Sequence, residues 1–343
     1  MEASIILKKY FPNISDFKII PIENGLINTT FLVEENSGQK KYILQKINTS
    51  IFKNPKAIVE NHCTINNLLQ QNGYTKQRVE IYNNSYGELI TLSETGNAWR
   101  LMSFIENSTT LLKVSDTKTV EKIAAAFSEF YKFINQNPLP LQEVLPNFLD
   151  FDLRMKDFFW ALEHGNPSFI AKAQPAIEFI KTQINLPNQW IDWQKKLSLP
   201  NRIIHADPKI SNILLDKHEN PICIIDLDTV MNGTLLYDFG DMVRSYTNKL
   251  EEDNPKNIDN FDSEIFLALK HGFLQHLENV LEKIELDNMD YAAQIVIYIQ
   301  AVRFLTDYLN GSVYYTIQRE NHNLERAINQ INLLKGLQQF LQK

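Results

Sequence analysis

The stretch from Ile203 to Asp241 constrains the fold of this chain more than any other. It holds two apolar runs rich in β-branched and aliphatic residues, over residues 212–215 and 222–226. Between them lies a polar segment, Asp216–Pro221, in which Asp, Asn and Pro supply turn chemistry. This pattern predicts a β-hairpin. Because the two ends of a hairpin lie side by side, residues before the first run should meet residues at the end of the second.

Polar residues stand at this open end in an order suited to phosphoryl transfer. That reaction needs a carboxylate to orient and deprotonate the attacking hydroxyl, and hard oxygen ligands for Mg²⁺. Asp207 suits the first role, and Asn212 and Asp226 suit the second, so we expect the three to converge. Lys209 could reach the moving γ-phosphoryl group as a point charge. The order His-x-Asp-x-Lys-x-x-Asn, a hairpin and then Asp matches the catalytic loop and metal-binding aspartate of kinases.

Asp226 is followed by Leu-Asp instead of Phe-Gly, which favours small-molecule kinases of the same fold over protein kinases. The segments HADPKISNILLD and IIDLDTVMNGTLLYDFGDMVR resemble the aminoglycoside phosphotransferase and choline kinase superfamily. Within it they are similar to N-acetylhexosamine 1-kinases, as is the run RFLTDYLNGSVYY at residues 303–315. The resemblance covers most of the chain. It implies ATP- and Mg²⁺-dependent phosphorylation of the anomeric hydroxyl of N-acetylglucosamine or N-acetylgalactosamine.

Other residues in the same stretch are expected to be structural. A single Asp or Asn near a turn is usually a cap or turn former, and only the whole set in kinase order indicates catalysis. His205 should pack and hydrogen-bond within the loop rather than transfer protons. Asp238 and Asp241 should hold the surrounding lobe together through backbone and arginine contacts, with a remote acidic role as the alternative.

The composition excludes several classes of function. The 343 residues are 44% hydrophobic and 22% charged, as in ordinary globular proteins. A net charge of -7 without any Lys/Arg-rich run gives no reason to expect nucleic-acid binding. No run approaches the ~18 apolar residues of a membrane span, and the N-terminus lacks the pattern of a signal peptide. The two cysteines, Cys63 and Cys223, lie in different predicted elements, so we expect a cytoplasmic protein with reduced thiols.

The first third of the chain is rich in strand signals, at residues 17–22, 30–34 and 41–47. The loop around Gly25 stands where kinases place the loop that covers the phosphates, although an ordinary hairpin turn is the alternative. Helical periodicity takes over after residue 120. We therefore expect an α+β, two-lobed protein-kinase-like fold, with a β-rich N-lobe carrying one helix over residues 1–105 and a mainly helical C-lobe over residues 106–343.

Lys46, at the end of the third predicted strand, is the candidate contact for the α- and β-phosphates, and Lys41 is its competitor. Strand alternation places Lys46 on the face of Tyr42 and Leu44. A charge among apolar neighbours needs a partner, and Glu60 on the following predicted helix is the expected one. Solvated side chains are the alternative for both residues.

Residues 99–105 are expected to connect the two lobes. In this fold, backbone groups of that connection bind adenine, and we place these contacts near Ser103 and Ile105. The sequence contains neither a G-x-x-x-x-G-K-[ST] loop nor a G-x-S-x-G nucleophile elbow, and no His/Cys spacing indicates zinc. The cofactors expected are therefore ATP and Mg²⁺ alone.

The acceptor should lie beyond Asp207, and four residues are candidates to bind it: Asp228, Arg303, Asp307 and Tyr314. Asp228 could accept hydrogen bonds from sugar hydroxyls or could contact a second metal ion. Arg303 and Asp307 share one helix face, so a structural ion pair is the alternative to substrate contact. Arg303 and the tyrosines fit a neutral polar sugar better than a cationic aminoglycoside.

Two other functions remain open at this stage. One is a kinase of another small hydroxyl compound: another sugar, an amino alcohol such as choline or homoserine, or an aminoglycoside. The other is a nucleotide-binding pseudokinase, which the presence of Asp207, Asn212 and Asp226 disfavours.

Overall fold

The structure is a computed structural model that describes residues 2–13, 17–22, 27–35, 40–114, 116–254 and 256–343. The chain forms two compact units. The first comprises Met1–Thr110, Phe133–Pro146 and Ser211–Asn232, and the second comprises Leu111–Lys132, Asn147–Ile210 and Gly233–Lys343. We expected a single boundary after residue 105, whereas the chain passes between the units several times.

The first unit contains a mixed arrangement of an antiparallel sheet and one long helix. The strands are β1 (Phe17–Ile22), β2 (Thr29–Glu35), β3 (Lys41–Lys46), β4 (Ile81–Tyr82), β5 (Thr91–Leu92) and β6 (Ala98–Ser103). Their order is β1-β2-β3-β6-β4, and β5 pairs with β6. The three strands predicted first are confirmed within a residue or two. The long helix is α2 (Pro55–Gln71), and it begins after Asn54, whose side chain accepts a hydrogen bond from the amide of Ala57.

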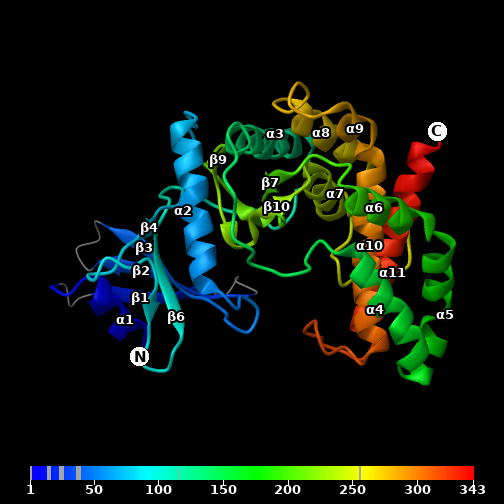
Figure 1. Cartoon of the computed structure of the whole chain (residues 1–343), viewed down its shortest axis with the longest axis horizontal. Helices are drawn as coiled ribbons and strands as arrows, with labels where there is room; N and C mark the ends of the chain where they lie inside the picture. Colours follow the sequence, from blue (N-terminus) through cyan, green and yellow to red (C-terminus); the bar gives the residue numbers. More distant parts are fainter. Residues whose placement is uncertain (1, 14–16, 23–26, 36–39, 115, 255) are drawn as a thin grey trace. The chain divides into compact units, whose positions relative to one another are not determined.

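The sheet has two different faces. The short helix α1 (Glu2–Tyr10) covers one of them, where Ile6 and Leu7 pack against Leu44, Trp99 and Leu101. Helix α2 lies on the other side of the sheet from α1 (Figure 1). Alternation along β3 and β6 therefore decides which side chains face α1 and which face α2.

A hairpin from later in the chain completes the first unit. It consists of β8 (Ile213–Leu215) and β9 (Pro221–Ile224), which pair antiparallel as predicted. Short 3-10 turns flank it, η1 (Ile210–Asn212) before and η2 (Leu227–Thr229) after. Backbone hydrogen bonds of 2.8 and 3.0 Å join Leu215 to Thr109, and one of 3.0 Å joins Gln77 to Ile222. These bonds are the physical reason that the hairpin belongs to the first unit.

The second unit is mainly helical. Its elements are α3 (Thr117–Ile134, of which the last residues belong to the first unit), α4 (Phe151–His164), α5 (Pro167–Thr182), α6 (Asn185–Lys196), β7 (Arg202–Ile204), α7 (Leu235–Tyr246), α8 (Ser263–Leu274), α9 (Lys283–Asp287), α10 (Met289–Leu309) and α11 (His322–Leu341). The short strand β10 (Met231–Gly233) precedes α7. The helical pattern between residues 263 and 287 forms two separate helices, α8 and α9.

Helix α10 is the centre of this unit. It packs most extensively against α11 and α7, and α10 and α11 run side by side (Figure 1). Gly240 permits the close crossing of α7 with α10, because a Cβ atom at this position would lie 2.6 Å from the carbonyl oxygen of Ala292. The core of the unit is thus set by one buried helix and its close neighbours.

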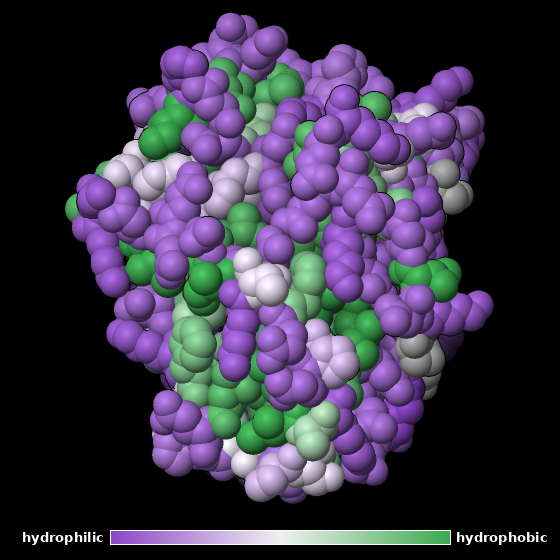
Figure 2. Space-filling model, turned by 90° about the vertical axis from the view of Figure 1, so that its right-hand side faces the viewer, coloured by the Kyte–Doolittle hydropathy of each residue, from purple (hydrophilic) through white to green (hydrophobic). Residues whose placement is uncertain are grey.

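One face of the molecule is mostly hydrophilic, with hydrophobic side chains showing in separate patches (Figure 2). Among the helices of the described residues, none is both long and apolar enough to cross a bilayer. The α+β class that we predicted, with an N-terminal antiparallel sheet and a larger helical C-terminal part, is confirmed.

Candidate active site

The buried carboxylate of Asp238, on α7, accepts hydrogen bonds from the loop that carries Asp207. Oδ2 of Asp238 accepts hydrogen bonds from the amide of His205 at 2.7 Å and from the Tyr131 hydroxyl at 2.6 Å. Oδ1 of Asp238 accepts from the amide of Ala206 at 3.0 Å. Ala206 has a φ of 64°, a left-handed conformation that is uncommon outside glycine. The expected structural role of Asp238 is confirmed, because its bonds stabilise a strained backbone next to Asp207.

His205 packs within this loop, as predicted. It is fully buried, and its ring meets the Phe127 ring edge-on at 5.7 Å. Its Nδ1 accepts a hydrogen bond from the amide of Asp207 at 3.3 Å. On the other side of the loop, the Tyr246 hydroxyl donates to the carbonyl oxygen of Pro208 at 2.8 Å. The backbone on both sides of Asp207 is therefore fixed by α3 and α7.

The side chains of Asp207 and Lys209 contact each other. The Lys209 Nζ lies 2.7 Å from Oδ2 of Asp207, and their side chains are 36% and 28% exposed. A carboxylate this accessible can receive a proton from an acceptor hydroxyl. The ammonium beside it can neutralise negative charge that develops nearby. Both residues belong to the second unit, whereas the predicted metal ligands belong to the first.

Asn212 and Asp226 lie at the open end of the hairpin. The amide of Ile225 donates to the carbonyl oxygen of Asn212 at 3.0 Å, which places Asn212 opposite the residue before Asp226. Asp226 has a φ of 62°, a second left-handed conformation at a predicted site residue. One amide oxygen and one carboxylate suit Mg²⁺, which takes its other ligands from phosphates and water. In the described part of the chain no cluster of three or more His, Cys, Asp or Glu residues forms a metal cage.

Lys46 and Glu60, two of the predicted nucleotide-binding residues, do not contact each other in the structure. Gly25 lies outside the described residues. Lys46 shares a face with Leu44, as expected, but that face packs against α1, and the Lys46 Nζ is 4.0 Å from a Glu2 carboxylate oxygen. Glu60, on α2, is 3.4 Å from the Lys56 Nζ and also hydrogen-bonds Gln142. Among the described residues, Lys46 and Glu60 therefore pair with other groups and come from opposite sides of the sheet.

The segment after β6 already uses several of its backbone groups. The amide of Ser103 donates to the carbonyl oxygen of Glu80 at 2.8 Å, and its hydroxyl oxygen accepts from the amide of Glu80 at 2.9 Å. The carbonyl oxygen of Ile105 accepts from the Ser108 hydroxyl at 2.6 Å. Adenine contacts at Ser103 and Ile105 stay predictions, and they must use the groups that these bonds leave available.

Asp228 is enclosed by protein groups. Its carboxylate lies 2.6 Å from Nη2 of Arg100 and accepts a second hydrogen bond from the Asn28 side chain at 2.8 Å. Both carboxylate oxygens of Asp228 accept hydrogen bonds from protein side chains, so this arrangement does not present them to a sugar. Arg100 was not among the predicted site residues. The signal that could have found it is a single charge inside the otherwise apolar run of β6, which requires a partner when buried.

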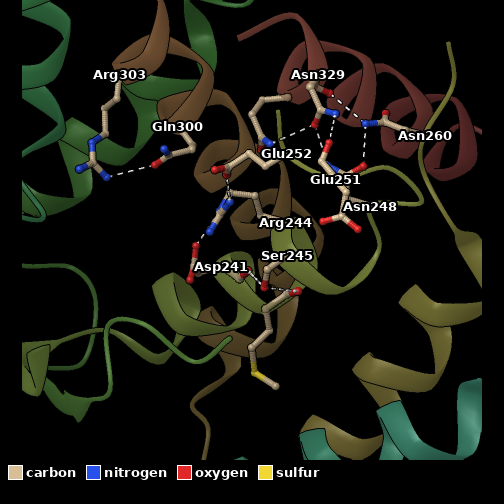
Figure 3. A network of polar contacts seen from close by, with 12 residues as sticks. Asp241, Arg244, Ser245, Asn248, Glu251, Glu252, Asn260, Gln300, Arg303 and Asn329 are labelled. Carbon is tan, nitrogen blue, oxygen red and sulfur yellow. Dashed lines mark hydrogen bonds and ion pairs between the residues drawn. The ribbon is translucent and has the colours of Figure 1, made fainter. Parts of the chain in front are cut away.

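Arg303 lies on α10 among aromatic rings. Its Nη1 donates to the Gln300 side-chain oxygen at 3.1 Å (Figure 3). Its guanidinium carbon lies 5.6 Å from the centre of the Phe148 ring and 5.9 Å from that of Tyr315. Burial, followed by the positive charge of Arg303, lowers the pKa of Arg154. Arg154 also lies 4.0 Å from an Asp157 carboxylate oxygen.

Asp307 does not form the ion pair with Arg303 that helical spacing would allow. Its carboxylate accepts hydrogen bonds from the backbone amides of Val313, Tyr314 and Tyr315 at 2.8 to 3.0 Å. The Asn323 side chain donates a fourth, at 2.8 Å. Asp307 thus shapes the turn that follows α10.

The tyrosines on that turn differ in their surroundings. Tyr314 is 72% exposed. Tyr315, which was not predicted, packs against Phe304 with ring centres 4.8 Å apart and faces Arg303. No local sequence signal separates the two tyrosines, because the turn held by Asp307 decides which one faces inward.

A second arginine of this unit pairs with acidic side chains. Arg244 lies between two carboxylates, with its Nε 2.7 Å from Asp241 and its Nη1 2.7 Å from Glu252 (Figure 3). The expected arginine contact of Asp241 is thereby confirmed. Since α7 carries Arg244 and also holds the Asp207 loop through Asp238, one helix supports both the loop and the polar groups near Arg303.

The fold and this loop define an ATP-dependent small-molecule phosphotransferase of the kinase-like class. The chain belongs to the phosphotransferase enzyme family, which matches residues 18–261. The predicted superfamily of aminoglycoside phosphotransferases and choline kinases is therefore confirmed.

Solved structures share the fold over nearly the whole chain. A microcompartment-associated aminopropanol kinase is 14% identical, with a TM-score of 0.65, 99% of this chain covered and 97% of the other. An aminoglycoside phosphotransferase from Alicyclobacillus acidocaldarius is 12% identical, with a TM-score of 0.66 and coverages of 98% and 96%. A spectinomycin phosphotransferase in complex with ADP and spectinomycin is 13% identical, with a TM-score of 0.57 and coverages of 98% and 98%.

Proposed function

We propose that this protein uses Mg²⁺-ATP to phosphorylate the C1 hydroxyl of an N-acetylhexosamine, GlcNAc or GalNAc, and releases the sugar 1-phosphate and ADP. The proposal joins the confirmed class of small-molecule phosphotransferase with the resemblance of residues 303–315 to N-acetylhexosamine 1-kinases. The observation that carries it is the environment of Arg303.

Arg303 favours a neutral polar acceptor. Its guanidinium meets an amide oxygen and two aromatic rings. The positive charge of Arg303 would repel an ammonium group, whereas the carbonyl oxygen of an acetamido group can accept hydrogen bonds from a guanidinium. The flat rings of Phe148 and Tyr315 can pack against the apolar face of a sugar. Among the predicted acceptor residues, we retain Arg303.

The catalytic roles follow from the residues of the loop. Asp207 accepts the proton of the C1 hydroxyl while that oxygen attacks the γ-phosphorus, and the bond to the β,γ-bridging oxygen breaks to release ADP. Lys209 then neutralises charge on the transferring group. Asn212 and Asp226 would hold Mg²⁺, which supplies charge neutralisation across the β- and γ-phosphates. The Ile105 amide would donate to adenine.

An amino alcohol or an aminoglycoside is the alternative acceptor, because solved structures of both kinds of kinase share this fold. The positive charge of Arg303 disfavours these positively charged compounds. A pseudokinase is disfavoured because Asp207, Asn212 and Asp226 are all present. We place the reaction in the cytoplasm, a proposal supported by Cys63 and Cys223, which are both free thiols.

The test is ADP release from Mg²⁺-ATP over a panel of acceptors. The panel holds N-acetylglucosamine, N-acetylgalactosamine, their 1-O-methyl glycosides, glucose, galactose, choline, 1-amino-2-propanol and kanamycin. We expect turnover with the free N-acetylhexosamines and none with the 1-O-methyl forms, which lack the reacting hydroxyl. Turnover of the methyl glycosides would refute the anomeric position. Turnover of a cationic compound alone would refute the sugar and leave the kinase class standing.

A further inference from the structure

The first unit contains a buried ion pair between the sheet and the turn that follows Asp226. Nη2 of Arg100, on β6, lies 2.6 Å from Oδ1 of Asp228, and both side chains are 2% exposed. Removing two charges from water costs several kcal/mol per ion before their mutual attraction offsets it. A buried ion pair is therefore weak evidence for a purely stabilising role, and a functional role has to be considered.

Arg100 is oriented by its neighbours across the sheet. The register sets Gln45 of β3 beside Arg100 and Thr30 of β2 beside Gln45. The Gln45 side-chain oxygen accepts from Nε of Arg100 at 2.9 Å and also from its Nη2. The Gln45 amide nitrogen in turn donates to the Thr30 hydroxyl at 3.0 Å. The guanidinium is therefore held by a row of side chains, and its direction is fixed.

Thr30, Gln45 and Arg100 lie on one face of the sheet, and Lys46, the predicted phosphate contact, lies on the other. In β3, Gln45 points toward the α2 side, and Lys46 points toward α1. Two cations of β3 and β6 stand on the α2 side: Lys41, whose Nζ lies 3.7 Å from a Glu34 and 3.9 Å from a Glu106 carboxylate oxygen, and Arg100, which contacts Asp228. Burial and then the charge of Arg100 lower the pKa of His62, on α2, to about 4, so His62 is neutral and adds no further cation.

Asp228 links this cation to the predicted metal ligand. It stands two residues after Asp226, within η2, which packs against α2. Its second oxygen accepts from the Asn28 side chain at 2.8 Å, and the Asn28 side-chain oxygen accepts from the amide of Asn48 at 2.9 Å. The turn that begins at Asp226 is thus anchored to the sheet on the side where Arg100 stands.

One donor of Arg100 is left over. Its Nη1 is buried and has no hydrogen-bond partner among the described residues. An unpaired buried donor is costly, and more so when it is charged. A phosphate oxygen is a suitable acceptor for this donor, because charge-assisted bonds from a guanidinium to phosphate are short and strong.

We propose that Arg100 is the cation of this chain that binds a nucleotide phosphate, with its free Nη1 as the donor and Asp228 and Gln45 holding the guanidinium in place. Arg100 thereby takes the part that sequence reasoning gave to Lys46. The inference rests on the proposed function only in taking the chain to bind Mg²⁺-ATP, and it is independent of the acceptor.

The experiment is isothermal titration calorimetry of Mg²⁺-ATP and of adenosine, without acceptor, on the full chain. The variants are Arg100→Lys and the double variant Arg100→Met/Asp228→Leu, which removes both charges together and so avoids an unpaired buried carboxylate. Lys18→Met, which removes an exposed cation from β1 of the same sheet, is the matched control.

We expect the double variant to bind Mg²⁺-ATP about 10- to 100-fold more weakly and adenosine within about twofold of wild type. Arg100→Lys should retain an intermediate affinity for Mg²⁺-ATP. Equal losses for the two ligands would refute a phosphate contact, because they would indicate a damaged sheet. Unchanged Mg²⁺-ATP affinity, or a phosphate-specific loss confined to Lys46→Met, would refute it as well. Failure of every N-acetylhexosamine as acceptor would contradict the proposed substrate without affecting this comparison.

Discussion

Asp238 and His205 are joined by a 2.7 Å hydrogen bond, in which the backbone amide of His205 donates to a carboxylate on α7. The bond connects a buried acid to the loop that carries Asp207. Because the same carboxylate also accepts from Ala206 and Tyr131, the geometry of the loop depends on one side chain. The protonation of that side chain has consequences for stability.

Stability should depend on pH through Asp238. Burial raises the pKa of Asp238 to about 7, against the opposing effect of hydrogen bonds from Tyr131 and two amides. In the interval between its ordinary pKa of 3.8 and about 7, the native state holds a proton that the unfolded chain has released. The contribution of Asp238 to the free energy of unfolding therefore falls as pH rises through this interval, by on the order of 1 kcal/mol per pH unit, and is constant above it.

Urea denaturation at a series of pH values can measure this contribution as the difference between wild type and Asp238→Asn. We expect the difference to shrink from pH 5 to pH 7 and then to level off. Tyr131→Phe removes a bond that stabilises the ionised carboxylate, so it should move the levelling to higher pH. A difference that does not vary with pH would contradict the assignment.

Asp207→Asn should remove the proposed base without disturbing the fold. We expect kcat to fall by about 10²- to 10⁴-fold, the range of general-base catalysis. Affinity for Mg²⁺-ATP, measured by calorimetry, should stay within about twofold. Asp192→Asn, at an exposed aspartate on α6, is the control. A variant that kept wild-type kcat would exclude Asp207 as the base.

Arg303→Lys should weaken acceptor binding selectively. Lysine keeps the charge but loses the flat guanidinium that lies near the Phe148 and Tyr315 rings. We expect KM for the N-acetylhexosamine to rise about 10- to 100-fold and KM for ATP to change by less than about twofold. Arg319→Lys, at an arginine that pairs with Glu325 on the surface, is the control. Equal increases in both KM values would point to a general structural defect.

The pair Arg202–Glu285 should contribute strongly to stability. Arg202 Nε and Nη2 donate to the two carboxylate oxygens of Glu285 at 2.9 and 2.6 Å, and Glu285 is fully buried. Arg202→Met leaves that carboxylate without its partner, so we expect a loss of about 3 to 5 kcal/mol in the free energy of unfolding. The double variant Arg202→Met/Glu285→Leu should recover most of it. If urea denaturation showed no recovery, lost packing rather than an unpaired charge would be the cause.

Gly240→Ala should separate α7 from α10. The added Cβ would lie 2.6 Å from the Ala292 carbonyl oxygen and 2.6 Å from a Val296 methyl carbon, well inside normal contact. We expect a loss of about 1 to 3 kcal/mol in the free energy of unfolding. Leu267→Ala, at an exposed leucine on α8, should change it by less than about 0.5 kcal/mol. Equal stability of Gly240→Ala and wild type would show that the two helices can move apart without cost.

Local patterns predicted the parts of this structure that depend on local interactions. Turn residues and strand propensity located the hairpin, and the spacing from Asp207 to Asn212 and Asp226 indicated the class of enzyme. The burial of His205 and the supporting role of Asp238 followed from the kinase-like motif and not from local interactions, because their contacts join the loop to α3 and α7.

Long-range packing decided the rest. Alternation along β3 groups Lys46 with Leu44, but it does not say which face of the sheet will meet α2, and α1 was not recognised as a helix. Helical spacing allowed Arg303 and Asp307 to pair, yet the carboxylate turned instead to the amides of residues 313–315. These contacts depend on which helix packs on each face of the sheet and on how the chain turns after α10, and neither is determined by local sequence.

The first unit is assembled from three separate stretches of the chain, and the last of them ends at Asn232. During synthesis on the ribosome, its sheet can form early, but the hairpin that bonds to Gln77 and Thr109 emerges only after residues 147–210 have been made. Until then, the surface of the N-terminal portion that later contacts the hairpin stays exposed, while residues 147–210 of the second unit are synthesised. A fragment ending near residue 110 would lack the hairpin altogether, so this surface would stay exposed.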